Sequence, residues 1–297
     1  VKALAMKKWF NTNYHYIVPE TEDDTKIKLS GDKLWNEYAE ADELGIETKP
    51  MLTGAYTMLK LCRYTGNKSE KDYVCDIIAA YKELLQTCGK KQIAWVQFDE
   101  PALVLDMDDS DKALFHQIYD ELLAVDTDTK VLLQTYFGDI RDIYEEVIKM
   151  PFAGIGLDFI EGKQTCDLVS KYGFPKDKVL FAGVVNGKNI WKNHYDKTLK
   201  VLSGLREKGI DTVISTSCSL LHVPYTLENE EKLSKEYTAY FSFAKEKLVE
   251  LSELGKLADS KNYAEYEIFK KNHKLFSGSR DCTNKDVRNR LSKVSES

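Results

Sequence analysis

The side chains best suited to recognising a ligand crowd into one short stretch of the printed sequence. Residues 6–20 hold four aromatic residues, one histidine, two lysines and two asparagines, and Pro19 closes the run. The stretch shows neither helical nor strand periodicity, so we expect an irregular loop. Loops positioned by a rigid scaffold often carry binding residues. The sequence therefore predicts a recognition surface in this segment.

Carboxylates at the ends of two predicted strands form a second candidate site. Asp99 and Glu100 precede Pro101, Asp158 lies at the end of a later predicted strand, and Glu161 lies just beyond it. An acid and a nucleophile or base on opposing carboxylates would suit a glycoside hydrolase, with Glu100 and Asp158 as the pair. However, adjacent side chains point to opposite sides of an extended backbone, so one of Asp99 and Glu100 would cap a helix or pair with a lysine. We favour this structural interpretation and leave the other open.

The sequence predicts no metal site and no catalytic residue. Cys218 and His222 are close enough in sequence to share a metal, but they would supply two ligands at best. We expect Cys218 to be a small buried side chain and His222 a packed loop residue that is hydrogen-bonded to backbone. The turn at residues 183–188 resembles a phosphate-binding turn, although a glycine-containing turn there is usually only a turn. No P-loop, Gly-x-Ser-x-Gly or Gly-x-Gly-x-x-Gly motif occurs.

Composition indicates an ordinary globular protein. The 297 residues are 43% hydrophobic and 30% charged, with a formal net charge of -6. The first 250 residues contain no basic block, and no apolar run reaches the roughly 18 residues that span a bilayer, so neither nucleic acid nor membrane is an expected partner. The six cysteines form no Cys-x-x-Cys pair, which favours reduced thiols and a cytoplasmic location. They are Cys62, Cys75, Cys88, Cys166, Cys218 and Cys282.

Short apolar runs alternate with amphipathic segments along most of the chain. The runs are nearly continuous rather than alternating, as in strands buried on both faces of a parallel sheet. Strict alternation of the two kinds of segment predicts an α/β fold. The predicted strands are residues 48–53, 93–98, 131–136, 155–159, 179–184 and 212–216. The predicted helices are residues 71–86, 111–125, 140–150, 163–172 and 197–208.

Six βα units are two short of a closed (β/α)8 TIM-type barrel. We therefore expect either a barrel without its first two strands or an open six-stranded sheet. A long helix is predicted over residues 229–254, because Leu233, Tyr237, Tyr240, Ala244, Leu248 and Leu251 keep helical spacing. The chain then becomes polar and basic, which predicts a barrel domain over residues 1–254 and a linker or tail over residues 255–297.

Five stretches at or beyond the predicted strand ends resemble the N-terminal half of the cobalamin-independent methionine synthases, over roughly residues 2–276. They are residues 6–20, 96–106, 135–139, 189–192 and 217–224. The resemblance implies a folate-binding barrel that takes part in methyl transfer from methyl-tetrahydropteroyl-polyglutamate to homocysteine. In the family, two further βα units and an Arg-Glu-Leu-Lys loop precede this region. The family's zinc ligands, a His-x-Cys pair, a Glu and a distant Cys, lie on a C-terminal barrel.

The resemblance also implies roles for single residues. Lys8 matches the lysine of the family motif Met-x-Lys-Trp-Phe, which contacts the folate, and an ammonium suits the carboxylates of a polyglutamate tail. Asn13 and His15 are expected either to bind the same ligand or to tie down their own loop. Trp9, Tyr14 and Tyr16 are expected to pack rather than to stack on a ligand. With zinc and homocysteine assigned to another domain, the chain alone is predicted not to turn over.

The chain departs from the family pattern at its predicted working face. Asn186-Gly187-Lys188 stands where the family has Asp-Gly-Arg, Glu161 stands where relatives usually carry Arg, and Gly54-Ala55 replaces Gly-Pro. These changes fit relaxed selection on a paralogue, or ordinary drift. A non-catalytic barrel that serves as a binding or scaffold module therefore stays open beside the methyltransferase.

Overall fold

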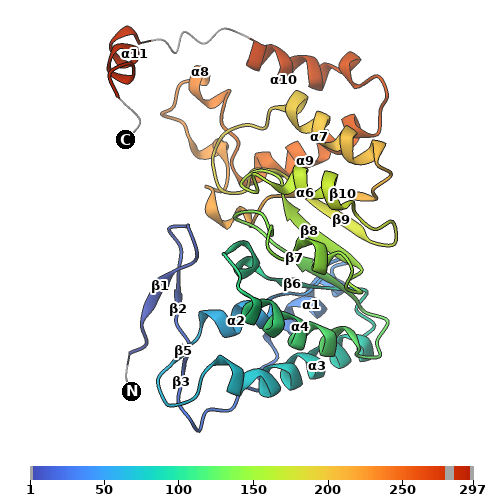
Figure 1. Cartoon of the computed structure of the whole chain (residues 1–297). Coiled ribbons are helices and arrows are strands. Elements are labelled where there is room, and N and C mark those ends of the chain that lie inside the picture. The colour runs from blue at the N-terminus through green and yellow to red at the C-terminus, as the bar shows by residue number, and fades with distance from the viewer. Residues whose placement is uncertain (1–2, 278–283, 295–297) are drawn as a thin grey trace.

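A six-stranded parallel sheet forms the centre of the computed structural model, which describes residues 3–277 and 284–294 (Figure 1). The strands lie in the order β10-β9-β8-β7-β6-β4, and every neighbouring pair is parallel. They are Met51–Thr53 (β4), Trp95–Asp99 (β6), Lys130–Gln134 (β7), Gly154–Asp158 (β8), Val179–Val185 (β9) and Thr212–Thr216 (β10). All six predicted strands are confirmed, with ends that shift by a few residues.

The middle strands are buried along their length, as the continuous apolar runs predicted. All five residues of β8 are buried, and so are four of the five residues of β7. Leu132, Leu133, Ile155 and Leu180 are fully buried and form part of the core. Helices on the sheet exclude water from these strands, which is the usual condition of a parallel sheet.

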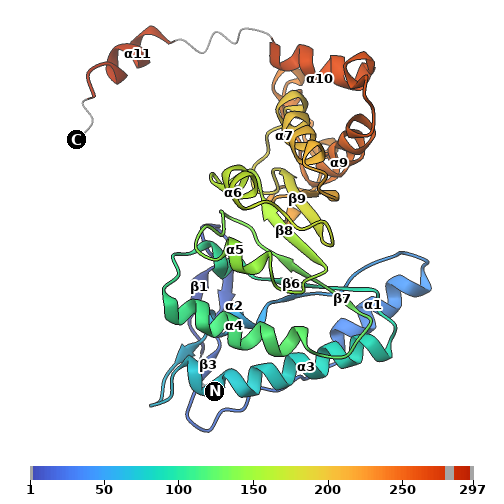
Figure 2. The ribbon, with the colours of Figure 1, turned by 45° about the vertical axis from the view of Figure 1, so that its right-hand side comes forward.

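The helices alternate with the strands. Four predicted helices are confirmed, namely Val74–Lys90 (α3), Asp109–Leu123 (α4), Thr165–Tyr172 (α6) and Tyr195–Glu207 (α7). The helix predicted at residues 140–150 is only one turn long, Tyr144–Val147 (α5). Two α-helices before β6 were not predicted, Lys33–Glu43 (α1) and Ala55–Leu61 (α2). Figure 2 shows α3 and α4 side by side. Helix α4 begins where the Asp108 side chain accepts the Asp111 N–H at 2.8 Å, a cap that satisfies a free amide.

The single long helix predicted over residues 229–254 is wrong. The segment contains a one-turn helix, Lys235–Thr238 (α8), and a longer helix, Ala244–Ala258 (α9). Between them, Ser242 N–H donates to the Ile190 carbonyl at 2.7 Å, and Phe241 forms an isolated antiparallel bridge with Trp191. Backbone pairing with a distant loop therefore interrupts the helical spacing. Helix α9 also buries a different face from the predicted one, since Leu248 is exposed while Leu254 is fully buried.

Part of the predicted tail is a packed helix. Helix Glu267–Ser277 (α10) lies against α7, and Figure 2 shows α7, α9 and α10 grouped together. Asn272 accepts the Tyr195 N–H at 3.0 Å and donates to the Asn193 carbonyl at 2.9 Å, so it also caps the start of α7. A last helix spans Lys285–Leu291 (α11). The predicted domain boundary after residue 254 stays a prediction, and residues 278–283 and 295–297 of the predicted tail lie outside the described residues.

The sheet is open between β4 and β10 in the described part of the chain, because each of these strands has one sheet neighbour. The α/β architecture with six parallel strands is thus confirmed, and closure into a barrel is not observed. The five described cysteines are free thiols. Among the described residues, no helix has the length and apolar character to cross a bilayer.

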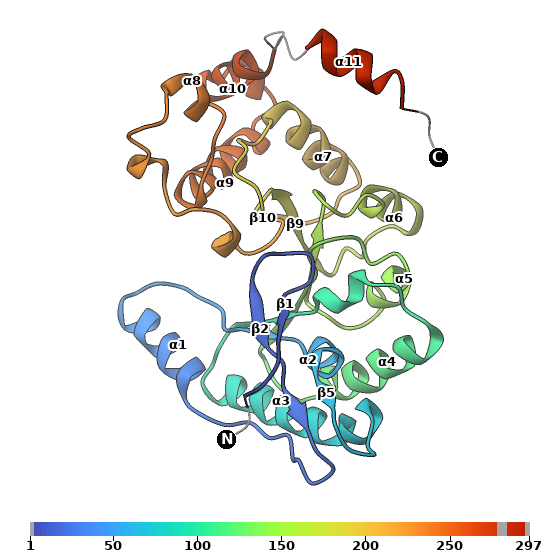
Figure 3. The same cartoon turned by 90° about the vertical axis from the view of Figure 1, so that its left-hand side faces the viewer.

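The segment expected to be irregular is a β-hairpin. Met6–Lys8 (β1) and His15–Ile17 (β2) pair antiparallel, and the next two residues of the chain lead into Glu20–Thr21 (β3), which pairs with Arg63–Tyr64 (β5). Figure 3 shows the hairpin rising from the region of α2 and β5, with its tip directed toward β9 and β10. Strands of three residues are too short for alternation to be visible in sequence, and this explains the missed prediction.

Candidate functional site

The tip of the N-terminal hairpin closes on itself through short hydrogen bonds. The Trp9 N–H donates to the Tyr14 carbonyl at 2.7 Å, and the Thr12 N–H donates back to the Trp9 carbonyl at 3.1 Å. The Thr12 hydroxyl donates to the same carbonyl at 2.6 Å and accepts the Tyr14 N–H at 3.2 Å. Phe10 adopts a φ of 50°, a left-handed conformation that is uncommon outside glycine. The tip is therefore a defined turn.

Aromatic rings attach this tip to the carboxyl ends of the central strands. Trp9 and Phe10 pack on a buried cluster formed by Tyr136, Phe137 and Cys218, which follow β7 and β10. The Phe10 and Phe137 ring centroids lie 6.1 Å apart. The prediction that Trp9 packs is thus confirmed.

Tyr14 and Tyr16 contact the protein at opposite ends of the hairpin. The Tyr16 ring lies 5.8 Å from that of Trp9, and its hydroxyl donates to the Leu61 carbonyl at the end of α2. The Tyr14 ring lies edge-on to His222 at 5.1 Å, and its hydroxyl donates to the Leu221 carbonyl. Packing is therefore confirmed for both rings, although half of Tyr14 stays exposed.

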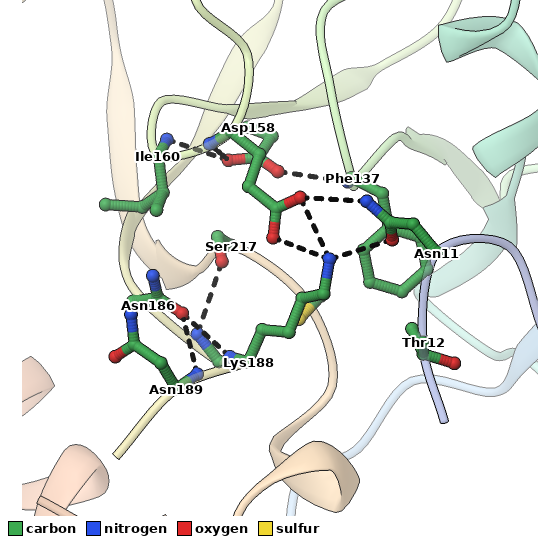
Figure 4. Close-up of polar contacts among 12 residues, drawn as sticks. Asn11, Thr12, Phe137, Asp158, Ile160, Asn186, Lys188, Asn189 and Ser217 are labelled. Carbon is green, nitrogen blue, oxygen red and sulfur yellow. Dashed lines mark hydrogen bonds and ion pairs between the residues drawn. The ribbon is translucent and has the colours of Figure 1, made fainter. Parts of the chain in front are cut away.

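Three polar side chains from separate loops meet at the tip and form what we call the tip cluster: Asn11, Glu161 and Lys188. Asn11 and Lys188 are labelled in Figure 4. The Lys188 ammonium lies 2.8 Å from Asn11 Oδ1 and 2.9 Å from Glu161 Oε1. Asn11 Nδ2 donates to Glu161 Oε2 at 3.1 Å, which closes the ring of contacts. Lys188 also lies over the Phe137 ring, 5.0 Å from its centroid. The hairpin is thus tied to the loops after β8 and β9.

The predicted ligand-binding residues lie on the same hairpin and are exposed. Lys8 and His15 are direct cross-strand partners, so their side chains share one face of the hairpin. Met6 and Ile17 are also partners on that face and are more than half exposed. Asn13 lies on the exposed tip. The Lys8, Asn13 and His15 side chains make no hydrogen bond or ion pair with the rest of the described chain, so their predicted role in ligand binding stays untested.

Glu100 and Asp158, the carboxylate pair considered for a glycosidase, are buried and accept hydrogen bonds from backbone amides. Glu100 is fully buried and accepts the Tyr56 N–H at 2.9 Å and the Thr57 N–H at 2.7 Å, so it caps the start of α2. Asp158 is 2% exposed and accepts three backbone N–H groups, from Phe137, Ile160 and Glu161, at 2.7–3.0 Å. The interpretation that one strand-end carboxylate caps a helix is confirmed, and the burial and backbone hydrogen bonds of both groups give the glycosidase alternative no support.

Burial perturbs the ionisation of these carboxyl groups. It raises the pKa of Glu100 to about 7 and that of Asp158 to about 6, although their hydrogen-bond donors favour the charged forms. Asp99 accepts from Gln97 Nε2 at 2.7 Å and from the Tyr136 hydroxyl at 3.1 Å, and burial raises its pKa to about 6. Perturbed pKa values often mark active sites, but here each raised value follows from the burial of a carboxyl group that accepts hydrogen bonds within the fold.

Cys218 and His222 do not form a metal-binding pair. Cys218 is buried, as predicted, and burial raises the pKa of its thiol to about 12, which disfavours the thiolate that a metal requires. His222 lies between the Tyr14 and Phe137 rings, and burial followed by the charge of Lys188 lowers its pKa. Its predicted packing is observed. Across residues 3–277 and 284–294, no three His, Cys, Asp or Glu side chains group closely enough to hold a metal ion.

Three backbone amides of the turn after β9 are already engaged within the protein and are not available to a phosphate. Asn186 Oδ1 accepts the Lys188 N–H at 2.8 Å and the Asn189 N–H at 3.0 Å, and the Gly187 N–H donates to the Ser217 hydroxyl at 3.2 Å (Figure 4). It is an asparagine-stabilised turn that aims Lys188 at the hairpin.

Comparison with known proteins shows which family the sequence matches. Residues 1–210 match the family model described as "Cobalamin-independent synthase, N-terminal domain". A protein of Lactococcus lactis subsp. lactis is 51% identical over 296 residues, which cover 100% of this chain and 38% of that protein. A protein of Campylobacter jejuni subsp. doylei is 49% identical over 291 residues, 98% of this chain and 38% of that protein. Both are named 5-methyltetrahydropteroyltriglutamate–homocysteine methyltransferase.

A solved structure shares the fold. A B12-independent methionine synthase from a Shewanella species, in complex with selenomethionine, aligns with a TM-score of 0.59 at 14% identity. The alignment covers 80% of this chain and 70% of that one. The chain spans about 38% of the length of the two curated relatives described above.

Proposed function

This chain belongs to the cobalamin-independent synthase family, whose N-terminal domain it matches over residues 1–210, and we propose that it is the folate-binding half of a methyltransferase. The proposed reaction moves a methyl group from 5-methyltetrahydropteroyltri-L-glutamate to L-homocysteine and yields methionine. The name carried by relatives of about 50% identity supports this reaction. The observation that carries the proposal is an exposed Lys8 that has no hydrogen bond or ion pair with the described part of the chain and lies opposite His15 on a hairpin anchored at the strand ends.

The hairpin's role is to bind and orient the polyglutamate tail. Lys8 supplies a positive charge for the carboxylates of the tail, and Asn13 and His15 supply hydrogen bonds. Because these groups are exposed, each contact is worth about 1 kcal/mol or less and weakens as salt is added. The anchored hairpin reduces the entropy lost on binding, since its backbone is already ordered before the ligand arrives.

The chemistry of the thiol acceptor is assigned elsewhere. In the family, zinc holds homocysteine as a thiolate, and thiolates and imidazoles are its usual ligands. Cys218 and His222 do not fit such a site, because the first is a buried thiol with a raised pKa and the second is enclosed by aromatic rings. In this proposal the chain binds folate and does not turn over by itself. Methionine formed by the purified chain with zinc and both substrates would refute that part.

The finer architecture belongs to the same proposal. We propose that residues 1–254 form a partial (β/α)8 barrel whose open edges at β4 and β10 accept two further strands. Residues 255–297 then lead toward a catalytic barrel. The proposed location of the protein is the cytoplasm. The open edges support the first statement, since edge strands normally need a partner or protection.

A titration of the chain with methyl-tetrahydropteroyl-triglutamate tests the proposal. We expect Lys8→Ala to weaken binding about fivefold, with a smaller effect on the monoglutamate, because the lost ammonium faces the tail. Lys7→Ala is the matched control, since Lys7 pairs with Tyr16 on the other face of the hairpin. Wild-type chain that fails to bind the triglutamate would favour the scaffold alternative. Equal losses in the Lys7 and Lys8 variants would contradict a specific role for Lys8.

A further inference from the structure

The tip cluster ties three separate segments together at one point. Asn11 lies on the hairpin, Glu161 follows β8 and Lys188 follows β9, and the Lys188 ammonium contacts both other side chains within 3.0 Å. We propose that Glu161 and Lys188 are positioning residues that act through Asn11 to hold the hairpin in its ligand-binding orientation. This inference rests on the proposed function for its consequence in folate binding, while its structural part is independent of any ligand.

The hairpin needs such an anchor because it is short. Two strands of three residues are not stable as an isolated hairpin in water. Apolar contact at Phe10 and Trp9 fixes one side of the tip, but aromatic rings allow rotation and sliding. Directional polar contacts fix the register of the tip more strictly, since hydrogen bonds weaken steeply when their angles change.

The cluster is well suited to this role. Its ion pair is partly shielded, with 22% of the Lys188 side chain and 28% of the Glu161 side chain exposed, so salt screens it less than a fully exposed pair. Asn11 is three residues from Lys8 and two from Asn13, and the Trp9–Tyr14 hydrogen bond closes the turn between them. If Asn11 is released, the proposed ligand-binding side chains lose their fixed direction. The entropy lost when the ligand orders them again then weakens the free energy of binding.

Hydrogen exchange in the ligand-free chain tests the structural part. Lys188→Met is expected to raise the exchange rate of the Trp9 and Thr12 amides about tenfold, because the tip opens more often, while amides of β7 and β8 keep their protection. Lys200→Met is the matched control, since Lys200 pairs with Asp196 at 2.8 Å on the remote helix α7. Unchanged exchange at Trp9 and Thr12 in a folded Lys188→Met variant would overturn the proposal.

A charge reversal separates positioning from simple destabilisation. The Asn11 amide offers one acceptor and one donor, so it can rotate to serve a pair of opposite polarity. The double variant Glu161→Lys with Lys188→Glu is therefore expected to recover most of the protection that each single variant loses. If both single variants and the double variant fold but the double variant exchanges as fast as the single ones, the cluster does not position the tip.

The binding consequence is tested by a double-mutant cycle. Lys188→Met is expected to weaken triglutamate binding about fivefold in the wild-type background and clearly less when Lys8 is already Ala, because only Asn13 and His15 then remain to be oriented. Additive losses would show that Lys188 does not act through the hairpin and would overturn the positioning role. If no variant binds folate, the proposed function fails, and the exchange experiment still decides whether the cluster holds the tip.

Discussion

Glu100→Ala is expected to lower the free energy of unfolding by about 4 kcal/mol. The Glu100 carboxylate accepts the Tyr56 and Thr57 N–H groups at the start of α2 and also the hydroxyl of the buried Tyr119. Each buried donor left without an acceptor costs about 1–3 kcal/mol, and the small side chain adds a cavity. Partial entry of water offsets some of this loss, which leads to the intermediate value. Urea denaturation followed by circular dichroism measures it.

The companion variant Glu100→Gln keeps the size of the side chain but turns one acceptor into a donor. We expect a loss of about 2 kcal/mol, because one helix amide then faces an NH2 group. Glu121→Ala is the matched control, since Glu121 is an exposed partner of Lys82 and should change stability by less than about 1 kcal/mol. An Ala variant that loses less than about 1 kcal/mol would refute the capping role of Glu100.

The same site predicts a pH dependence with a definite sign. Burial raises the pKa of Glu100 to about 7 from a reference value of 4.5, so the folded state binds this proton more tightly than the unfolded state. The contribution of Glu100 to stability is therefore greatest below about pH 4.5 and falls by up to about 3 kcal/mol as the pH rises through 7. Glu100→Gln removes this dependence, so its difference from the wild type should be larger at pH 5 than at pH 8. A difference that grows with pH would contradict the reasoning.

Two further predictions concern the turn and thiol at the strand ends. Gly187→Ala should lower the melting temperature, because a Cβ at that position would lie 2.3 Å from the Cys218 carbonyl oxygen. Gly204→Ala is the control and should raise the melting temperature, because its Cβ meets nothing within 4 Å on helix α7. Melting temperatures that shift in the same direction in both variants would contradict this prediction. Maleimide labelling of the native chain at pH 8 should modify the exposed Cys75 well before Cys218, whose buried thiol has its pKa raised to about 12, and equal labelling rates would indicate that the Cys218 pocket opens readily.

Sequence periodicity was sufficient to predict the central sheet. Strands β7 and β8 are buried on both faces and contain little besides apolar residues and glycine, and short runs of this kind between amphipathic segments are typical of a parallel sheet. Helix prediction succeeded where the apolar face packs on the sheet, as in α3 and α4. It failed at residues 229–254 because the pairing of Phe241 with Trp191 joins segments 50 residues apart, and helical spacing carries no signal of such a contact.

The candidate site was predicted only in part. The motif around Lys8 directed attention to the hairpin, and the strand-end positions of Glu161 and Lys188 placed them on the same side of the fold. Asn11 was overlooked as a site residue, because its partners are 150 and 177 residues away in sequence. A polar residue at the apex of a crowded aromatic segment was the available signal, since such a residue must either meet solvent or reach a partner across the fold.

The contacts of the tip cluster change how the departures from the family pattern should be interpreted. The resemblance implies a carboxylate at position 186 and arginines at positions 161 and 188, whereas this chain has Asn186, Glu161 and Lys188. Glu161 and Lys188 carry opposite charges and lie 2.9 Å apart, so these two departures are compatible with each other in the folded chain. The carboxylate lost from the β9 loop is instead replaced by one on the β8 loop, where it also accepts from Asn11. An arginine at position 161 would place two like charges beside the hairpin tip, so the carboxylate of Glu161 is what gives Lys188 an ion-pair partner there.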